Sequence, residues 1–299
     1  MSRSVLSDFP WPSVPGMIEP PKWVGDGFLT NGKKQGSLIC YNQTESNWSE
    51  HLTELHEQEA ENGQHPLDIA SRQLALRSFR SIAKEDKALI LDVGCSSGYM
   101  LRDFQTILPH LNLIGSDYLN GPLNKLSHYL PTIPLLQFDL QGCPLPDNSI
   151  DGVVALNVLE HIERDQEALC HLQRIIRPGG IAHIEVPANP ELYDIYDECL
   201  MHHRRYALPE ILSKAKSAGF EILRATHLGF SIYPAFWAVK KWNLRYLLKN
   251  EEQKQNIVAR QIRQTNNSLI MKLLIELEMK LGTYVKFPWG IRCVLKCRK

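Results

Sequence analysis

The 299-residue chain lacks an excess of charge of either sign, because 33 Lys and Arg residues balance 33 Asp and Glu residues. A balanced chain has no overall basic field that draws it to a polyanion. We therefore expect no nucleic-acid partner, although a neutral chain can still carry a local basic patch.

The chain also lacks a long apolar run. The longest apolar stretch, residues 228–239, has about a dozen residues and is interrupted by Pro234, whereas roughly 20 are needed to span a bilayer. We expect no transmembrane segment.

Cysteine is scarce and irregularly spaced. The seven cysteines are an odd number and include no C-x-x-C pair, which excludes the disulfide framework of small secreted domains. The first 16 residues contain three prolines and no apolar run behind a basic start, unlike a secretory signal. These absences predict a cytoplasmic protein with reduced thiols.

Short apolar or β-branched runs alternate with helical patterns over most of the chain. The expected strands are 88–93, 111–116, 134–138, 150–157, 180–186, 220–226 and 291–296. The expected helices between them are 99–108, 122–129, 165–176 and 209–218. Because this alternation needs crossover connections, it indicates a parallel sheet with helices on both faces. We predict a doubly wound, Rossmann-like α/β fold.

The chain divides into four segments by composition. Residues 1–65 form a Pro- and Gly-rich arm that we expect to be irregular up to a lid helix from Asn47, and a second helix follows at 66–83. The predicted α/β core spans 66–228, a helical insertion spans 229–288, and a closing strand spans 289–299. The aromatic residues of the insertion and the arm form either a lid over a ligand or ordinary core contacts.

A glycine-rich turn follows the first core strand in the sequence LILDVGCSSG, residues 89–98. Such a turn lets the backbone approach a ligand closely and surrounds it with helix N–H groups. Asp117 follows the next strand, where an acidic side chain can accept hydrogen bonds from both ribose hydroxyls. The spacing matches neither the G-x-G-x-x-G pattern of nicotinamide enzymes nor the P-loop. A nucleotide-like cofactor is therefore indicated.

These residues resemble the class I S-adenosylmethionine-dependent methyltransferases, particularly the small-molecule branch that includes the quinone-biosynthesis enzymes. Residues 92–98 resemble the D-x-G-x-G-x-G motif, with Ser96 in place of the middle glycine. Asp117 corresponds to the acid that holds the ribose. Further motifs in family order are FDL at 138–140, the fourth strand and its end at 151–162, and RPGG at 177–180.

The resemblance implies a seven-stranded mixed sheet with an antiparallel last strand, and S-adenosylmethionine as the cofactor. Asp92 and Gly94 would hold the methionine end, and Asp117 the ribose. The full set of expected cofactor-binding residues is Arg72, Asp92, Gly94, Cys95, Ser96, Gly98, Asp117, Tyr118, Asp139, Leu140 and Asn157.

Three of these residues, Asp139, Asn157 and Arg72, also have a simpler structural interpretation. Asp139 and Leu140 would contact the adenine, but Asp139 is otherwise a solvated turn residue. Asn157 would lie beside the sulfonium, or else it only caps the end of a strand. Arg72 would pair with the cofactor carboxylate, or else it is an exposed helix arginine.

The candidates for chemistry are histidines at the expected carboxyl edge of the sheet. Methyl transfer to a hydroxyl needs a base, and histidine serves near neutral pH. His161 and His202 are equal candidates, with Tyr206 as a further catalytic candidate. The neighbouring substrate-binding candidates are His203, Arg204 and Arg205; the arginines suit an acceptor with a carboxylate or phosphate.

No metal is expected, because Asn157 stands where some polyprenyl-phenol O-methyltransferases carry the first carboxylate of a Glu-x-x-Glu-His site. We therefore predict methylation of a small molecule, with oxygen favoured by the two histidines. N-methylation of an amine, a catalytically degenerate binding protein and, more distantly, a nicotinamide enzyme are the alternatives. The protein is expected to be a monomer or a homodimer.

Overall fold

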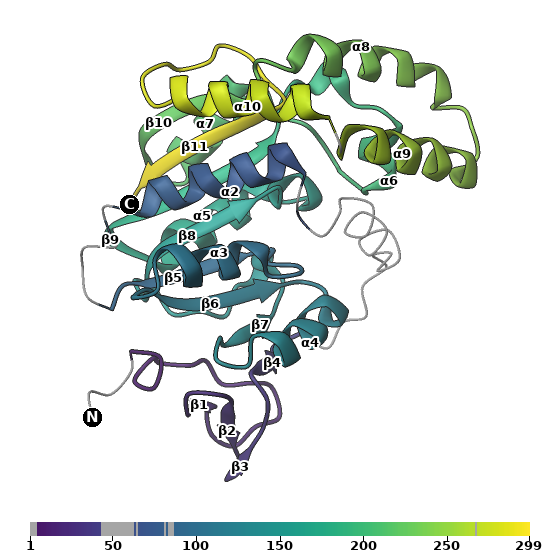
Figure 1. Ribbon diagram of the computed structural model, residues 1–299. Helices are drawn as coiled ribbons and strands as arrows, with labels where there is room; N and C mark the ends of the chain where they lie inside the picture. The colour runs from purple at the N-terminus through teal and green to yellow at the C-terminus, as the bar shows by residue number, and fades with distance from the viewer. Residues whose placement is uncertain (1–4, 43–62, 64, 81, 83–86, 267) are drawn as a thin grey trace.

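An eight-stranded mixed sheet runs through the molecule in the order β10-β11-β9-β8-β5-β6-β7-β4 (Figure 1). Of the chain, the computed structural model describes residues 5–42, 63, 65–80, 82, 87–266 and 268–299. The strands are β4 (Leu38–Cys40), β5 (Leu89–Val93), β6 (Asn112–Asp117), β7 (Leu135–Gln137), β8 (Ile150–Leu156), β9 (Ile176–Pro187), β10 (Glu221–Leu228) and β11 (Arg292–Arg298). Strands β4 to β9 pair in parallel, and β11 is antiparallel to both neighbours. The predicted doubly wound mixed sheet is confirmed.

Helices cover both faces of this sheet, as strands that are apolar throughout require. One face carries α2 (Pro66–Phe79), α3 (Tyr99–Ile107) and α4 (Asn120–Tyr129); the other carries α5 (Asp165–Ile175) and α7 (Leu208–Ser217). Alternate residues of β5 pack on opposite faces of the sheet. Leu89, Leu91 and Val93 pack in the cluster that contains α5 and α7, whereas Ile90 packs against α2 and α3.

The N-terminal arm is more regular than its sequence predicts. It forms a small antiparallel sheet of β1 (Lys22–Trp23), β2 (Phe28–Thr30) and β3 (Lys33–Lys34), and it then adds β4 to the main sheet beside β7. The expected seven strands therefore become eight. Strands of two or three residues are too short to show a periodicity, which is why the pattern indicated an irregular arm. The helix expected from Asn47 lies outside the described residues.

The expected helical insertion lies between β10 and β11. It consists of α8 (Tyr233–Asn243), the short η5 (Leu244–Tyr246), α9 (Glu251–Asn266) and α10 (Leu269–Leu281), gathered at the top of Figure 1. None of the helices in the described part of the chain is both long and apolar enough to cross a bilayer. After β9 the chain also forms η4 (Pro190–Leu192) and α6 (Ile195–Cys199), in a segment where the sequence showed no periodic pattern.

Candidate functional site

A cavity of about 1170 Å³ lies at the carboxyl edge of the parallel strands. Its lining residues come from the ends of β5, β6, β8 and β9 and from the insertion helices α8 and α10. This is the edge at which doubly wound sheets bind their ligands. The volume exceeds the roughly 300–1,000 Å³ usual for one small ligand, so the cavity has room for two.

The turn between β5 and α3 forms one wall of the cavity. Gly94 and Gly98 have φ angles of 70° and 74°, in the left-handed region that favours glycine. A Cβ on Gly94 would lie 2.6 Å from Val158 Cγ2, so this position has no room for a side chain. Ser96 also has a positive φ, of 43°, and its backbone N–H donates to Asp117 Oδ2 at 2.9 Å.

Two carboxylates face one another across this turn. Asp92 is buried, its Oδ2 has no hydrogen-bond partner among the described residues, and burial together with the charge of Asp117 raises its pKa. Asp117 accepts backbone N–H groups from Ser96 on Oδ2 and from Leu119 on Oδ1. Asp117 also lines the cavity, where its carboxylate can face a ligand hydroxyl. An unsatisfied buried acceptor beside such an acid fits a ligand rich in hydrogen-bond donors.

The other expected cofactor residues lie around the same cavity. The lining includes Arg72, Asp92, Gly94, Cys95, Ser96, Asp117, Tyr118, Asp139, Leu140 and Asn157. Gly98 is not in the lining; a Cβ there would lie 2.5 Å from Leu126 Cδ1, so its role is to let α3 and α4 approach. Arg72 is already paired with Asp103 at 2.6 Å.

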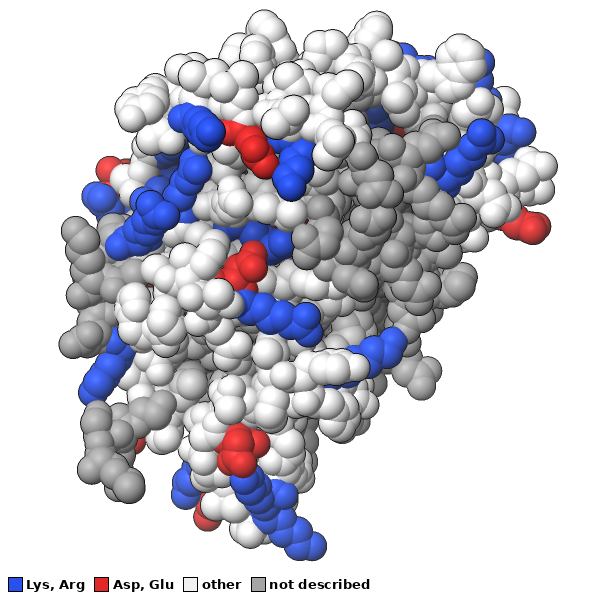
Figure 2. All heavy atoms as spheres, viewed as in Figure 1, with Lys and Arg blue, Asp and Glu red and all other residues white. Residues whose placement is uncertain are grey.

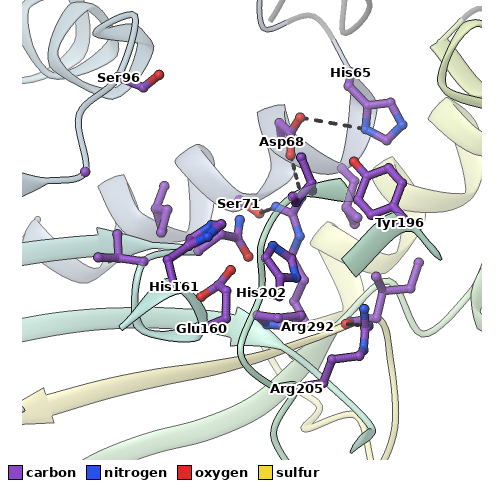
Figure 3. A pocket seen from close by; sticks show the side chains of 18 of the residues that line it. His65, Asp68, Ser71, Ser96, Glu160, His161, Tyr196, His202, Arg205 and Arg292 are labelled. Carbon is purple, nitrogen blue, oxygen red and sulfur yellow. Dashed lines mark hydrogen bonds and ion pairs between the residues drawn. The ribbon is translucent and has the colours of Figure 1, made fainter. Parts of the chain in front are cut away.

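A cluster of three side chains lies deeper in the cavity, where β8 ends. Glu160 and His161 come from η3 (Leu159–His161), and His202 follows α6. The two imidazole rings meet edge to face with centroids 4.6 Å apart. One ligand atom from each of the three residues lies within 4.8 Å of the others, and Figure 3 shows the three side chains turned toward one another. One carboxylate and two imidazoles are donors that could hold a divalent transition metal.

Asp197 orients His202. Its Oδ1 lies 2.9 Å from His202 Nδ1 and 2.8 Å from Arg205 Nη1, while its Oδ2 lies 2.8 Å from Lys240 Nζ. Burial alone would raise the pKa of Asp197, but the hydrogen bond from His202 and the two cations hold it below its usual range. A carboxylate at Nδ1 requires the proton on that nitrogen, which leaves Nε2 as an acceptor.

The protonation of this cluster follows from its burial. Burial lowers the pKa of His202, and the charges of Arg205 and Lys240 act in the same direction against the hydrogen bond with Asp197. Burial raises the pKa of Glu160 to about 8, against the opposing effect of a backbone hydrogen bond and of the charges of Arg292 and Arg205. At pH 7 the pair is therefore a neutral imidazole beside a neutral carboxylic acid.

Besides Gly98, two predicted site residues lie outside the cavity lining. Tyr206 is buried and donates its O–H to Asp165 at 2.9 Å, so its hydroxyl is directed away from the cavity. Arg204 turns to Asp165 as well, at 3.2 Å, and does not bind at the cavity. The other members of this segment, His202, His203 and Arg205, line the cavity. The charge of Arg205 is already paired with Asp197.

Several residues that shape the site were missed by sequence reasoning. Lys240 of α8 bridges Asp194 and Asp197, at 2.6 and 2.8 Å, although it lies more than 40 positions away in the chain. Arg292 of β11 lies 2.9 Å from Glu185 of β9 and lines the cavity. Pairs formed by the tertiary fold leave no local spacing that a sequence pattern can detect.

Comparison with known proteins agrees with this geometry. Residues 91–184 match the family described as methyltransferase domain. A protein of Mycolicibacterium smegmatis, named a probable S-adenosylmethionine-dependent methyltransferase, is 28% identical over 138 residues, which cover 44% of this chain and 52% of the relative. A ubiquinone/menaquinone biosynthesis C-methyltransferase of Syntrophotalea carbinolica is 26% identical over 147 residues, which cover 47% of this chain and 60% of that protein.

The chain thus spans about half the length of the curated relatives it matches. Among solved structures, a candidate sarcosine dimethylglycine methyltransferase of Galdieria sulphuraria superposes with a TM-score of 0.51 and 15% identity, covering 84% of this chain and 91% of that one. At this identity the likeness establishes a shared fold, which is the fold predicted from the sequence.

Proposed function

We propose that the protein is an S-adenosylmethionine-dependent methyltransferase with a small-molecule acceptor, because residues 91–184 match the methyltransferase domain family. The observation that carries the proposal is the single cavity shared by the β5–α3 turn and the histidine cluster. A methyl donor held at the turn and an acceptor held near His202 would share one enclosed space. Holding two reactants together in this way removes much of the entropic barrier to their reaction.

The residues of the turn fit the expected cofactor. Asp92 and Gly94 would hold the methionine end, Asp117 would accept the ribose hydroxyls, and Asp139 with Leu140 would contact the adenine. Support comes from the unsatisfied oxygen of Asp92, the absence of space for a side chain at Gly94 and the position of Asp117 in the cavity lining. When bound, the cofactor supplies a methyl group on a sulfonium that leaves readily.

His202 is the proposed proton acceptor. The Asp197 carboxylate holds the proton on Nδ1, so the Nε2 lone pair takes the proton of an acceptor hydroxyl in the cavity. The lowered pKa keeps the imidazole neutral at pH 7, as a general base must be before it reacts. His161, in edge contact with His202, would orient the acceptor. The neutral base favours O-methylation; an amine acceptor that is already deprotonated would need no base.

Binding of the cofactor tests the proposal without knowledge of the acceptor. Calorimetric titration with S-adenosylmethionine and S-adenosylhomocysteine is expected to give micromolar affinity. Asp117→Asn should weaken binding about 10- to 100-fold, the cost of losing charge-assisted hydrogen bonds. Asp147→Asn, a surface carboxylate paired with Arg174, is the control and should bind as the wild type does.

Absence of binding by the folded wild type would contradict the proposal. Binding without release of S-adenosylhomocysteine toward any acceptor in a broad panel of phenols, acids and amines would favour the degenerate binding protein instead. A change in reduced-dinucleotide fluorescence on mixing would point to the nicotinamide alternative.

A further inference from the structure

Charge is distributed unevenly between the insertion and the rest of the chain. Residues 229–290 contain ten Lys and Arg residues but only four Asp and Glu residues. Because the whole chain is neutral, the remainder carries an equal acidic excess. The overall balance that argues against a polyanionic partner therefore conceals one strongly basic segment, and that segment lies at the top of Figure 1.

The outer face of α10 is apolar where a surface helix is usually polar. Ile275, Glu278 and Met279 lie buried on the inner side of this helix. At about 100° per residue, the opposite arc presents Leu269, Ile270, Leu273, Leu274, Leu277 and Leu281 to solvent. Ile270 is 72% exposed and Leu273 66%. A helix that is apolar on its solvent side as well needs something to cover it.

The neighbouring helix α8 extends this surface. Its start packs with α10, since Tyr233 and Phe236 join the same cluster as Ile275 and Met279. Beyond that contact Trp237, Val239 and Trp242 are exposed. Tryptophan, with an apolar body and one N–H donor, is typical of the boundary between lipid and water.

Basic side chains border this apolar surface. Figure 2 shows white atoms across the top of the molecule, where α8 and α10 lie, with blue Lys or Arg side chains below them. The exposed cations of the two helices and the segments after them are Arg245, Lys249, Lys272, Lys280 and Lys286, and the exposed acid of α10 is Glu276. Apolar and basic groups together match an anionic lipid surface.

The cavity opens beside this surface. Ile270 and Leu274 of the exposed α10 face also line the cavity, as do Phe236 and Val239 of α8. The apolar face is therefore continuous with the entrance to the site. A covering bilayer would seal the entrance from water and give apolar molecules a path to it.

We propose that the exposed faces of α8 and α10 dock on the surface of an anionic lipid bilayer. The proposal goes beyond the methyl transfer proposed above and does not depend on it. A second copy of this chain is the poorer occupant, because it would bring the same basic excess against itself. Docked in this manner, the two helices would lie in the plane of the membrane interface, which is the usual orientation of amphipathic helices, and neither would cross the membrane.

Sedimentation of the full chain with vesicles tests this directly. Vesicles of phosphatidylcholine with about one third phosphatidylglycerol should bring down the wild type, and vesicles of phosphatidylcholine alone should bring down much less. The double variant Leu273→Glu/Leu277→Glu should bind at least tenfold more weakly. Both positions are exposed, so the fold should be kept. Ile107→Glu, at an equally apolar exposed site on α3, is the matched control and should bind normally.

The charge contribution is tested by Lys272→Glu/Lys280→Glu. For each lysine replaced, the affinity of this variant for anionic vesicles should fall about fivefold. The difference in affinity between variant and wild type should shrink at high salt. Wild type that stays in the supernatant with anionic vesicles would overturn the proposal, as would a Leu273→Glu/Leu277→Glu variant that sediments like wild type. A wild-type dimer in light scattering that this variant converts to a monomer would assign the face to a second copy and overturn it too.

Discussion

At the residue scale, the role proposed for His202 depends on which of its ring nitrogens carries the proton. Asp197 is fixed between two cations and accepts a hydrogen bond from His202 Nδ1, which leaves Nε2 as the acceptor nitrogen. His161 instead meets the His202 ring edge to face, with the ring centroids 4.6 Å apart. This difference separates two histidines that sequence reasoning left equal.

We predict that His202→Asn lowers the rate of methyl transfer by about two to four orders of magnitude, the usual contribution of a general base. His161→Asn should have a smaller effect, seen mainly in KM for the acceptor. The measurement is release of S-adenosylhomocysteine with an acceptor. Tyr206→Phe is the control, because the Tyr206 O–H donates a hydrogen bond to Asp165 outside the cavity. Comparable, small losses in both histidine variants would contradict the assignment of the base.

The second residue-scale prediction concerns Glu160 and pH. Its folded pKa is raised to about 8 from an ordinary value of 4.5, so between these values the folded state keeps a proton that the unfolded state has lost. Stability therefore falls as the pH rises through this window, on the order of 1.4 kcal/mol per pH unit for this group, and levels off above it.

Glu160→Gln should remove that contribution, so the variant should lose less free energy of unfolding between pH 5 and pH 8 than the wild type. Denaturant unfolding at both pH values measures the difference. Glu167→Gln, an exposed carboxylate paired with Arg164, should leave the pH dependence unchanged. Parallel pH profiles for the wild type and Glu160→Gln would contradict the protonation proposed for the cluster.

At the element scale, the turn between β5 and α3 is the feature most constrained by backbone geometry. Gly94→Ala would place a Cβ 2.6 Å from Val158 Cγ2 at a φ of 70°. We expect a loss of about 1–2 kcal/mol in stability from the left-handed conformation alone and at least tenfold weaker binding of S-adenosylhomocysteine. Calorimetry and denaturant unfolding measure the two effects.

Gly142→Ala is the matched control for this substitution. Nothing lies within 4 Å of a Cβ at that position, so both binding and stability should stay close to wild type. Unchanged binding in Gly94→Ala would mean that the ligand does not approach this turn.

The elements of the core were predictable because each carries its own periodic signal. Strands β5 to β11 and helices α2 to α7, α6 excepted, lie within a few residues of the expected ranges. Strands β1 to β4 escaped prediction because they are only two or three residues long, and β4 also pairs with β7, a strand distant in sequence. Helix α6 escaped because five residues complete barely more than one helical turn.

At the scale of the whole molecule, the site is assembled from segments that sequence patterns treat separately. The family motifs identified the turn and the histidines, but Lys240 and Arg292 enter the site from the insertion and the closing strand. The arm likewise joins the main core, where Trp11 packs edge to face on Phe28 with ring centroids 4.9 Å apart. Such contacts follow from tertiary folding and leave no trace in local spacing.

A crystal structure with bound S-adenosylhomocysteine is the decisive measurement, because the donor site and the proposed base must share one cavity. We predict that the ribose hydroxyls bind Asp117 and that the sulfur faces the part of the cavity that contains Asn157 and His202. A ligand bound elsewhere, or protein atoms between the sulfur and His202, would contradict the proposed methyl transfer.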